Sequence, residues 1–413
     1  MTKLTPDVRF GGFSNAWEQR ELGKLGNTFT GLSGKTKEDF GHGDAKFITY
    51  MNVFSNSIAN FNGTECVEID DKQNQVKFGD VFFTTSSETP EEVGLSSVWL
   101  DNTENIYLNS FCFGYRPTKK FDPYYLAFML RSPSIRKNFI FLAQGISRYN
   151  ISKSKVMEIK VPIPELAEQE RIGGLFRQLD NLITLHQRKL SELENVKKAM
   201  LLKMFPKEGQ PVPEIRFKGF TDAWEQRELG KLGNTFTGLS GKTKEDFGHG
   251  DAKFITYMNV FSNSIANFNG TECVEIDDKQ NQVKFGDVFF TTSSETPEEV
   301  GLSSVWLDNT ENIYLNSFCF GYRPTKKFDP YYLAFMLRSP SIRKNFIFLA
   351  QGISRYNISK SKVMEIKVPI PELAEQERIG GLFRQLDNLI TLHQRKLKKM
   401  KNIKKAFLEK MFV

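Results

Sequence analysis

Apolar residues in the first 164 positions occur mostly in short runs separated by polar stretches that contain Gly or Pro. The segments "KFITYMNVF" (46–54), "QVKFGDVFFTT" (75–85) and "VMEIKVPIP" (156–164) are rich in β-branched and aromatic residues, which is typical of strands. The segment 122–143, "DPYYLAFMLRSPSIRKNFIFLA", instead predicts two helical pieces separated by a Ser-Pro step. This part of the chain therefore predicts a mixed domain with a strand-rich centre.

The pattern changes at Glu165, where apolar residues begin to recur at three- and four-residue steps. Pro164 is well placed just ahead of a helix start. The stripe would be roughly 60 Å long if the helix were continuous at 1.5 Å per residue. Gly173-Gly174 weakens this helix by about 1 kcal/mol per glycine relative to alanine and suggests a bend. The stripe consists of Ile172, Leu175, Phe176, Leu179, Leu182, Ile183, His186, Leu190, Leu193, Val196 and Met200.

An internal repeat dominates the sequence. Residues 16–190 return without a change at 223–397, an offset of 207 residues, while both ends of the repeat diverge. This period is far too long for a solenoid and indicates a tandem of two whole domains. The long helical stripe therefore has a twin at 372–412, which is the expected packing partner; the alternative is that each helix packs only on its own domain.

These patterns predict an α+β fold. Two mixed α/β globular domains are expected to be separated by two long antiparallel, coiled-coil-like helices with pseudo-two-fold symmetry. The predicted boundaries are 1–161 for the first domain, 162–206 for the first helix, 207–368 for the second domain and 369–413 for the second helix. The segment "PKEGQPVPE", rich in Pro, Gly and charge, links the two copies.

Composition narrows the class of protein only a little. The net charge of +7 permits a polyanionic partner without requiring one. No apolar run approaches the roughly 20 residues that span a bilayer, and the start of the chain lacks the apolar core of a signal peptide, so we expect a cytoplasmic protein with no membrane contact. The four cysteines, Cys66, Cys112, Cys273 and Cys319, match no zinc pattern and are expected to be buried free thiols.

The chain carries no convincing catalytic motif. Gly34-Lys35-Thr36 resembles the end of a phosphate-binding loop, but Phe29 stands where that loop needs its first glycine. An S-adenosylmethionine-type Gly-rich loop, an Asn-Pro-Pro-[Phe/Tyr] motif and helicase motifs are missing from the sequence, and its four histidines are scattered. We therefore expect no catalytic residue, no metal site and no cofactor in this chain.

The segment that begins "VPIPELAEQERIGGLFRQLDNLITLHQRKL" resembles the spacer helix of type I restriction-modification specificity (S) subunits. The segments "WEQRELGKL", "FGDVFFTTSS" and "GISRYNISKSKVMEIKVPIP" are similar to landmarks of the family's target recognition domains. The matching helix residues are Pro164, Glu168, Gln169, Ile172, Leu179, Asp180, Ile183, His186, Gln187 and Leu190.

This resemblance implies a non-enzymatic subunit that reads double-stranded DNA as two separated half-sites. It also implies that the chain holds two methyltransferase (M) subunits and can be joined by restriction (R) subunits, with S-adenosylmethionine, ATP and Mg²⁺ bound in the partners. The chain departs from the family in one respect, because its two recognition domains are the same. An interrupted palindrome is therefore expected as the target. The alternative is a bivalent scaffold that binds a protein or glycan.

Candidate DNA contacts are polar and basic residues, because lysine and arginine bind phosphates and Arg, Asn, Gln and hydroxyl groups can read base edges. In the first copy they are Lys35, Lys37, Thr84, Thr85, Ser86, Ser87, Gln144, Ser147, Arg148, Tyr149, Asn150, Lys153 and Lys155. In the second copy they are Lys242, Lys244, Thr291, Thr292, Ser293, Ser294, Gln351, Ser354, Arg355, Tyr356, Asn357, Lys360 and Lys362. Further candidates are His42, Arg131, Arg136, Lys137 and the glutamates of 86–92, which could accept from cytosine N4 or simply be solvated.

Overall fold

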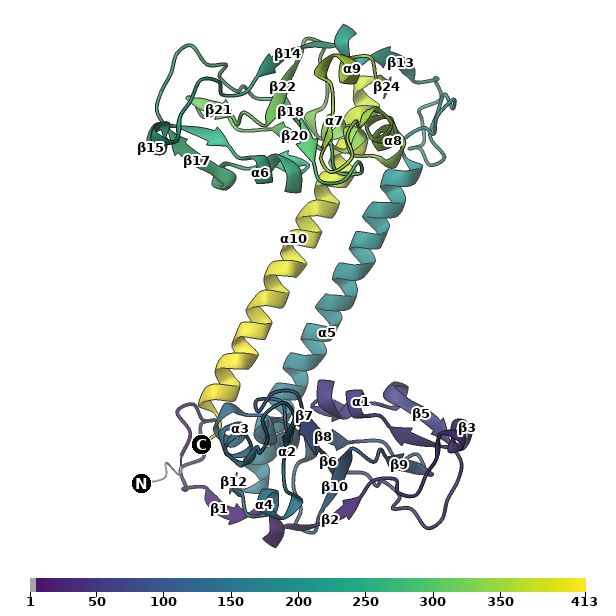
Figure 1. The fold of residues 1–413 in the computed structure, drawn as a ribbon, viewed down its shortest axis with the longest axis vertical. Coiled ribbons are helices and arrows are strands. Elements are labelled where there is room, and N and C mark those ends of the chain that lie inside the picture. Colours follow the sequence, from purple (N-terminus) through teal and green to yellow (C-terminus); the bar gives the residue numbers. More distant parts are fainter. Residues whose placement is uncertain (1–4) are drawn as a thin grey trace. The chain divides into compact units, whose positions relative to one another are not determined.

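The computed structural model describes residues 5–413, which form two compact units. The first unit contains the chain up to Gln187 together with Arg395–Val413, and the second contains Arg188–Gln394 (Figure 1). Each unit therefore combines one globular domain with helical segments from both halves of the chain.

The main sheet of the first unit has five strands in the order β2-β10-β6-β8-β4. Its strands are β2 (Gly26–Thr30), β4 (Ile58–Ala59), β6 (Val81–Thr84), β8 (Ser96–Trp99) and β10 (Cys112–Pro117). All neighbours pair antiparallel except β4 and β8, which are parallel. Every residue of β6 and β8 is buried, as expected for strands at the centre of a covered sheet.

The remaining strands form smaller sheets. β3 (Phe40–Ile48) pairs antiparallel with β5 (Thr64–Val67) and parallel with β9 (Ile106–Leu108). β1 (Glu18–Glu21) pairs antiparallel with β12 (Lys160–Ile163). The helices of the domain are α1 (Tyr50–Ser55), α2 (Pro123–Leu130), α3 (Pro133–Leu142) and α4 (Lys153–Met157), with 3₁₀ turns at Leu22–Lys24, Lys37–Asp39 and Phe61–Gly63.

The second unit repeats this arrangement. Its elements are β13 (Glu225–Glu228), β14 (Gly233–Thr237), β15 (Phe247–Ile255), α6 (Tyr257–Ser262), β16 (Ile265–Ala266), β17 (Thr271–Val274), β18 (Val288–Thr291), β19 (Ser293–Ser294), β20 (Ser303–Trp306), β21 (Ile313–Leu315), β22 (Cys319–Pro324), α7 (Pro330–Leu337), α8 (Pro340–Leu349), β23 (Tyr356–Asn357), α9 (Lys360–Met364) and β24 (Lys367–Ile370). The mixed α/β class predicted from the sequence is confirmed in both units.

All three predicted strands are shorter than expected, and in the run 75–85 only Val81–Thr84 is a strand. The run 46–54 changes from strand to helix α1 at Thr49, whose side chain caps the helix by accepting a hydrogen bond from the Asn52 backbone N–H. In the run 156–164, the first two residues belong to helix α4 and only Lys160–Ile163 is extended. The break between the two helices of 122–143 is confirmed at Ser132, directly before Pro133.

Helices α5 (Leu166–Lys203) and α10 (Leu373–Lys410) each contain 38 residues. In the first unit the Phe176 ring stacks on Phe412 with centroids 5.6 Å apart. Four residues further along α5, Asp180 forms a 2.5 Å ion pair with Lys404. Rising numbers on α5 thus meet falling numbers on α10, so the predicted antiparallel pairing is confirmed within this unit.

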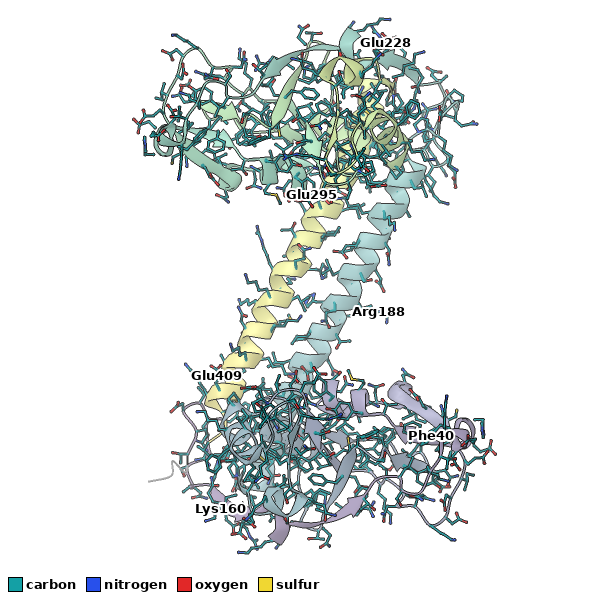
Figure 2. All side chains as sticks on the ribbon, in the orientation of Figure 1. Phe40, Lys160, Arg188, Glu228, Glu295 and Glu409 are labelled. Carbon is teal, nitrogen blue, oxygen red and sulfur yellow. The ribbon has the colours of Figure 1, made fainter. Side chains whose placement is uncertain are left out.

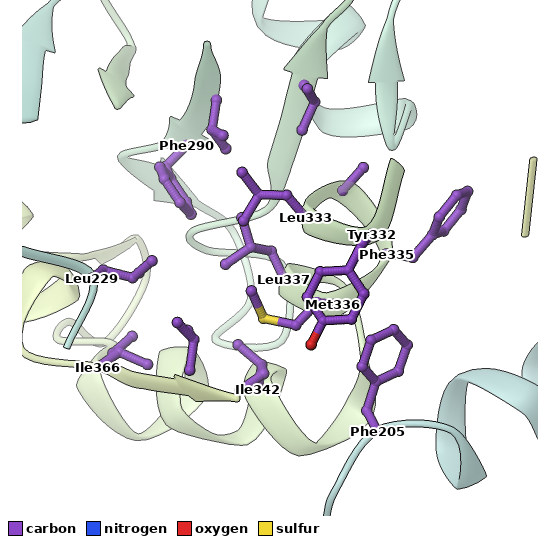
Figure 3. Packing of buried hydrophobic residues seen from close by; sticks show 14 of the residues in the cluster. Phe205, Leu229, Phe290, Tyr332, Leu333, Phe335, Met336, Leu337, Ile342 and Ile366 are labelled. Carbon is purple, nitrogen blue, oxygen red and sulfur yellow. The ribbon is translucent and has the colours of Figure 1, made fainter. Parts of the chain in front are cut away.

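The end of each repeat completes the core of the other repeat's domain. Met411 and Phe412 lie in the core of the first unit with Trp17 and Tyr125. Likewise, Met204 and Phe205 lie in the core of the second unit, where Figure 3 shows Phe205 beside Tyr332. Each domain core is therefore built from residues of both repeats.

The apolar stripe predicted for α5 is correct in part. Ile172, Phe176 and Leu179 are buried, but Leu182 is 42% exposed and does not belong to the packed seam. Gly173 has a packing role: a Cβ at this position would lie 2.0 Å from the Asp122 side chain, which caps α2. Glycine is required here because the two helices approach so closely, and α5 is helical throughout.

A buried ion pair ties the start of α5 to the domain. Arg9 donates two hydrogen bonds to Glu168, at 2.7 and 2.8 Å, and the Trp17 indole N–H donates a third at 3.1 Å. The Glu168 side chain is only 1% exposed. Arg216, Trp224 and Glu375 repeat this cluster in the second unit. Glu168 thus satisfies its oxygens by contacts within the protein.

All four cysteines are free. Cys112 and Cys319 are buried, as predicted, and burial raises the pKa of each thiol to about 12. Cys66 and Cys273 are only partly buried, which corrects the expectation that all four would be inside. Among residues 5–413, no helix is long and apolar enough to cross a membrane.

Candidate nucleic-acid interface

Two candidate segments that are far apart in the sequence lie side by side in the fold. β7 (Ser86–Ser87) pairs antiparallel with β11 (Tyr149–Asn150), and the Ile151 N–H donates to the Thr85 carbonyl at 3.0 Å. β19 and β23 repeat the pairing in the second unit. The strand pairing therefore joins the basic stretch 144–155 to this strand end in each domain. Ser86, Ser87, Ser293 and Ser294 are themselves buried, at 6 or 7% exposure, so they support the hairpin and are corrections to the candidate DNA contacts.

A tight hairpin displays the centre of this basic stretch. Gln144 and Asn150 exchange backbone hydrogen bonds of 2.9 and 2.8 Å. Gly145 has a φ of 144°, and a Cβ there would lie 2.0 Å from the Arg148 carbonyl oxygen, so only glycine fits. The tip consequently carries Ile146, which is 96% exposed, together with the exposed side chains of Ser147 and Arg148.

Helix α4 continues the exposed basic surface after the hairpin. Lys153 and Lys155 are both exposed. Lys155 is paired with Glu158 at 3.0 Å, which offsets part of its charge, and Lys362 is paired with Glu365 in the same way. Surface pairs of this kind contribute little to stability, so they can exchange for a phosphate contact at low cost.

In the second unit the surface borders a hollow of about 470 Å³. Arg355 reaches into it and donates to the Ser293 hydroxyl at 3.1 Å. Its lining also includes Glu299 and Glu295, which is labelled in Figure 2. A guanidinium donor and carboxylate acceptors therefore line the same hollow. Such a mixture can recognise the donor and acceptor pattern of a base edge.

The same hollow contains two aromatic residues that sequence reasoning missed. Tyr257 and Phe261 stack with centroids 5.8 Å apart, and the Tyr257 hydroxyl donates to the Ser293 carbonyl at 2.8 Å. Burial raises the pKa of Tyr257 above its ordinary value. Tyr257 and Phe261 are four residues apart, a spacing that brings two side chains together on a helix. The sequence did not indicate this pair, because the β-rich composition of the segment predicts a strand.

The prediction that Thr84 and Thr291 contact DNA is wrong. Both are fully buried, and their hydroxyls accept hydrogen bonds of 3.0 Å from the backbone of Leu95 and Leu302. They stabilise the strand end from inside and do not reach the surface. Thr85 is partly exposed, but its hydroxyl donates to the Phe111 carbonyl at 2.8 Å.

Arg131 and Arg136, which were also candidate DNA contacts, instead bind backbone carbonyls inside the domain. Arg131 donates to the carbonyls of Ser96, Val53, Phe54 and Asn56. Arg136 donates to the carbonyls of Gly94, Glu91 and Val93. These hydrogen bonds fix the end of the acidic segment 86–92. Burial lowers the pKa of each guanidinium to about 10, so both still carry a charge at neutral pH. Lys137 is exposed.

The loop that contains Gly34-Lys35-Thr36 is less accessible to DNA than its sequence suggested. Lys35 is only 11% exposed and pairs with Asp70 at 3.3 Å and with Asp39 at 3.7 Å. In the second unit Lys242 pairs with Asp277 and Asp246, the twins of these carboxylates. Lys37 and Lys244 remain exposed. His42 contacts Glu68 and the Glu38 carbonyl. Lys35 thus forms ion pairs within the domain and is not a free surface cation.

The fold and its surfaces define a class of tandem recognition proteins. Two repeated α/β domains each present a polar, basic hairpin and are each followed by a long helix. The chain belongs to the family described as the type I restriction modification DNA specificity domain, which matches residues 15–195 and 221–402. Among residues 5–413, no group of three or more His, Cys, Asp or Glu side chains could hold a metal ion.

Individual relatives agree with this assignment. The type I restriction enzyme MjaVIII specificity subunit of Methanocaldococcus jannaschii is 23% identical over 70% of this chain and 69% of its own length. The EcoKI specificity subunit of Escherichia coli is 25% identical over 73% of this chain and 68% of its own length. The type I restriction-modification S subunit from M. genitalium shares the fold with a TM-score of 0.58, 15% identity and 99% coverage of both chains.

Proposed function

We propose that this chain is the DNA sequence-specificity subunit of a cytoplasmic type I restriction-modification complex. It has no catalytic role of its own: it reads a bipartite target in double-stranded DNA and holds two M subunits, to which R subunits can be added. The observation that carries the proposal is the exposed hairpin around Arg148, which is joined to Ser86–Ser87 in one domain and repeated in the other. S-adenosylmethionine, ATP and Mg²⁺ would be bound by the partners.

Each domain offers two kinds of DNA contact. Lys153 and Lys155 are placed to neutralise phosphates, which positions the protein without reading sequence. Gln144, Arg148 and Asn150 carry side chains that can pair with base edges, and all three residues are exposed. Because the two domains have the same residues at these positions, we propose that they read identical half-sites.

DNA affinity should depend strongly on salt. Replacing Arg148, Lys153, Lys155 and their twins Arg355, Lys360 and Lys362 with alanine should lower the slope of log affinity against log salt, by about 0.9 for each phosphate that is no longer neutralised. Fluorescence anisotropy with a target duplex measures this slope. A matched control replaces exposed lysines outside the hairpin surface, Lys72, Lys119, Lys120, Lys279, Lys326 and Lys327. Equal effects of the two sets, or none from the first, would identify the hairpin as ordinary surface and favour a non-DNA scaffold.

Exposed leucines on the long helices are proposed as part of the docking surface for the M subunits. Leu182 and Leu185 are exposed on α5, as are Leu389 and Leu392 on α10. Replacing Leu182 and Leu389 with aspartate should leave the melting temperature nearly unchanged, because neither side chain is in the core, but should weaken copurification with the M subunit at least tenfold. Normal assembly of the double variant would contradict this role.

The purified chain should not hydrolyse ATP. Its Gly-Lys-Thr loop lacks the first glycine of a phosphate-binding loop, and Lys35 is held by Asp39 and Asp70. A phosphate-release assay should give the same rate as buffer, with or without DNA. ATP turnover that disappears in the Lys35→Ala, Lys242→Ala variant would overturn the proposed non-catalytic role.

A further inference from the structure

The second halves of α5 and α10 carry very different charge although the domains before them are the same. Residues 395–409 of α10 contain seven cations and one carboxylate, whereas the equivalent residues 188–202 of α5 contain four cations and two carboxylates. The difference arises mainly at three positions, where Ser191, Glu192 and Glu194 of α5 are replaced by lysines in α10. The repeat is therefore asymmetric on these helices.

The added lysines extend an exposed face of α10. Arg395, Lys398, Lys399 and Asn402 recur at three- and four-residue steps, which places them on one side of a helix with 3.6 residues per turn. They line a shallow groove of about 450 Å³ whose apolar part comes from Ile403 and Ala406. Lys401 and Lys405 flank this face and are exposed. We call Arg395, Lys398, Lys399, Lys401 and Lys405 the basic face.

The cations of the basic face are not neutralised within the protein. In residues 5–413, none of the five forms an ion pair, whereas Lys404 on the packed side pairs with Asp180. On α5, by contrast, Arg188 pairs with Glu192 at 3.0 Å and Lys189 pairs with the same carboxylate at 3.6 Å. The positions of α5 that are equivalent to the basic face carry two cations and two carboxylates, whereas the basic face carries five positive charges. The equivalent α5 residues are Arg188, Ser191, Glu192, Glu194 and Lys198.

The chemistry of the basic face suits a nucleic-acid backbone better than a protein. Protein interfaces are depleted in lysine, and their charges are usually mixed in sign. Phosphate contacts instead come mainly from lysine and arginine, with asparagine as an additional donor. The face extends over about 15 Å from Arg395 to Lys405 at 1.5 Å per residue, a length over which duplex DNA carries about nine phosphates.

We infer that the basic face of α10 binds the phosphate backbone of duplex DNA without reading its sequence. This inference rests on the proposed function for the identity of the polyanion, but it assigns a contact outside the two target-reading hairpins. The contact would be present on α10 and absent from α5. Because it depends on phosphates alone, it would strengthen binding to any duplex and would be screened by salt.

The α5 sequence supplies the replacement residues for a variant of α10 that tests this inference. The variant Lys398→Ser, Lys399→Glu, Lys401→Glu gives α10 the residues that α5 has at the twin positions, so the helix should fold normally. Binding of the full-length protein to a 30-bp duplex without the target is measured between 50 and 200 mM salt. If these three cations contact phosphates, their removal should lower the slope of log affinity against log salt by about 2.7. Between 50 and 200 mM salt, the variant should therefore lose about 40-fold less affinity than the parent protein loses.

A control separates a local contact from overall charge. The variant Lys72→Ser, Lys119→Glu, Lys120→Glu changes three exposed lysines of the first domain and alters the net charge by the same amount. Its slope should remain close to that of the parent protein. An equal fall in both variants, or no fall in the α10 variant, overturns the inference.

Two further readouts distinguish this inference from the proposed function. Cells that express the α10 variant with the M subunit should keep the parental methylated motif, because the hairpins are intact. Loss of M-subunit binding with unchanged DNA binding would show that the basic face contacts an acidic protein surface, which contradicts the inference. If the parent protein binds no duplex DNA at all, the proposed function itself fails.

Discussion

Replacing Glu168 with alanine should lower the free energy of unfolding of the first unit by about 3–5 kcal/mol, the usual cost of removing one partner from a buried ion pair. The substitution leaves Arg9 largely buried without its carboxylate and removes the acceptor of the Trp17 indole N–H. Differential scanning calorimetry should show an early transition for the first unit. Glu375→Ala should have the same effect on the second unit, where Arg216 and Trp224 lose their partner.

The matched control is Glu170→Ala, which removes the same type of side chain two residues later on the same helix. Glu170 is exposed, so its loss should change the free energy of unfolding by less than about 0.5 kcal/mol. A Glu168→Ala protein as stable as this control would show that the cluster does not hold α5 to the domain.

Periodicity in the sequence predicts most of the fold. The two long helices, the break before Pro133 and the tandem of α/β domains follow from apolar spacing and from the repeat. The predicted strand at 46–54 is partly wrong because Thr49 caps a helix inside a β-rich run, a local hydrogen bond that composition does not show. Leu182 fits the apolar stripe, yet it lies outside the packed part of the helix surface.

The candidate site is harder to predict because polar residue types do not show where their side chains end up. Arg131 and Arg136 have the composition expected of DNA contacts, but the fold surrounds both with backbone carbonyls. Thr84 is polar yet lies inside the strand end. In contrast, Ser86–Ser87 and Tyr149–Asn150 are separate candidates in the sequence and are brought together by strand pairing. The predicted domain boundaries and the remaining contact residues stay predictions.

Changing the hairpin in only one copy should alter only one half of the recognised DNA. Arg148→Ala affects the first domain, and Arg355→Ala makes the same change in the second. If Arg148 contacts a guanine through two of its N–H donors, its removal should cost about 1–3 kcal/mol of discrimination at that base pair. With each single variant, the complex should therefore methylate a motif that is degenerate at one position of one half-site. With the double variant, specificity should be lost at the matching position in both half-sites.

This expectation depends on the symmetry that we propose for the complex. Two identical domains related by an approximate two-fold axis would read inverted half-sites, because target palindromy mirrors protein symmetry. The base pairs between the half-sites would not be read, and the half-site centres would lie about 10 bp apart, near one turn of DNA. The observation on which this proposal rests is the identity of residues 16–190 and 223–397.

The symmetry of the target can be determined by methylome sequencing of cells that express this chain with its M subunit. We expect a single methylated motif that is an interrupted palindrome, with two inverted copies of one half-site around an unread spacer. An asymmetric motif, or a continuous motif without a spacer, would show that the two domains do not read identical, inverted half-sites.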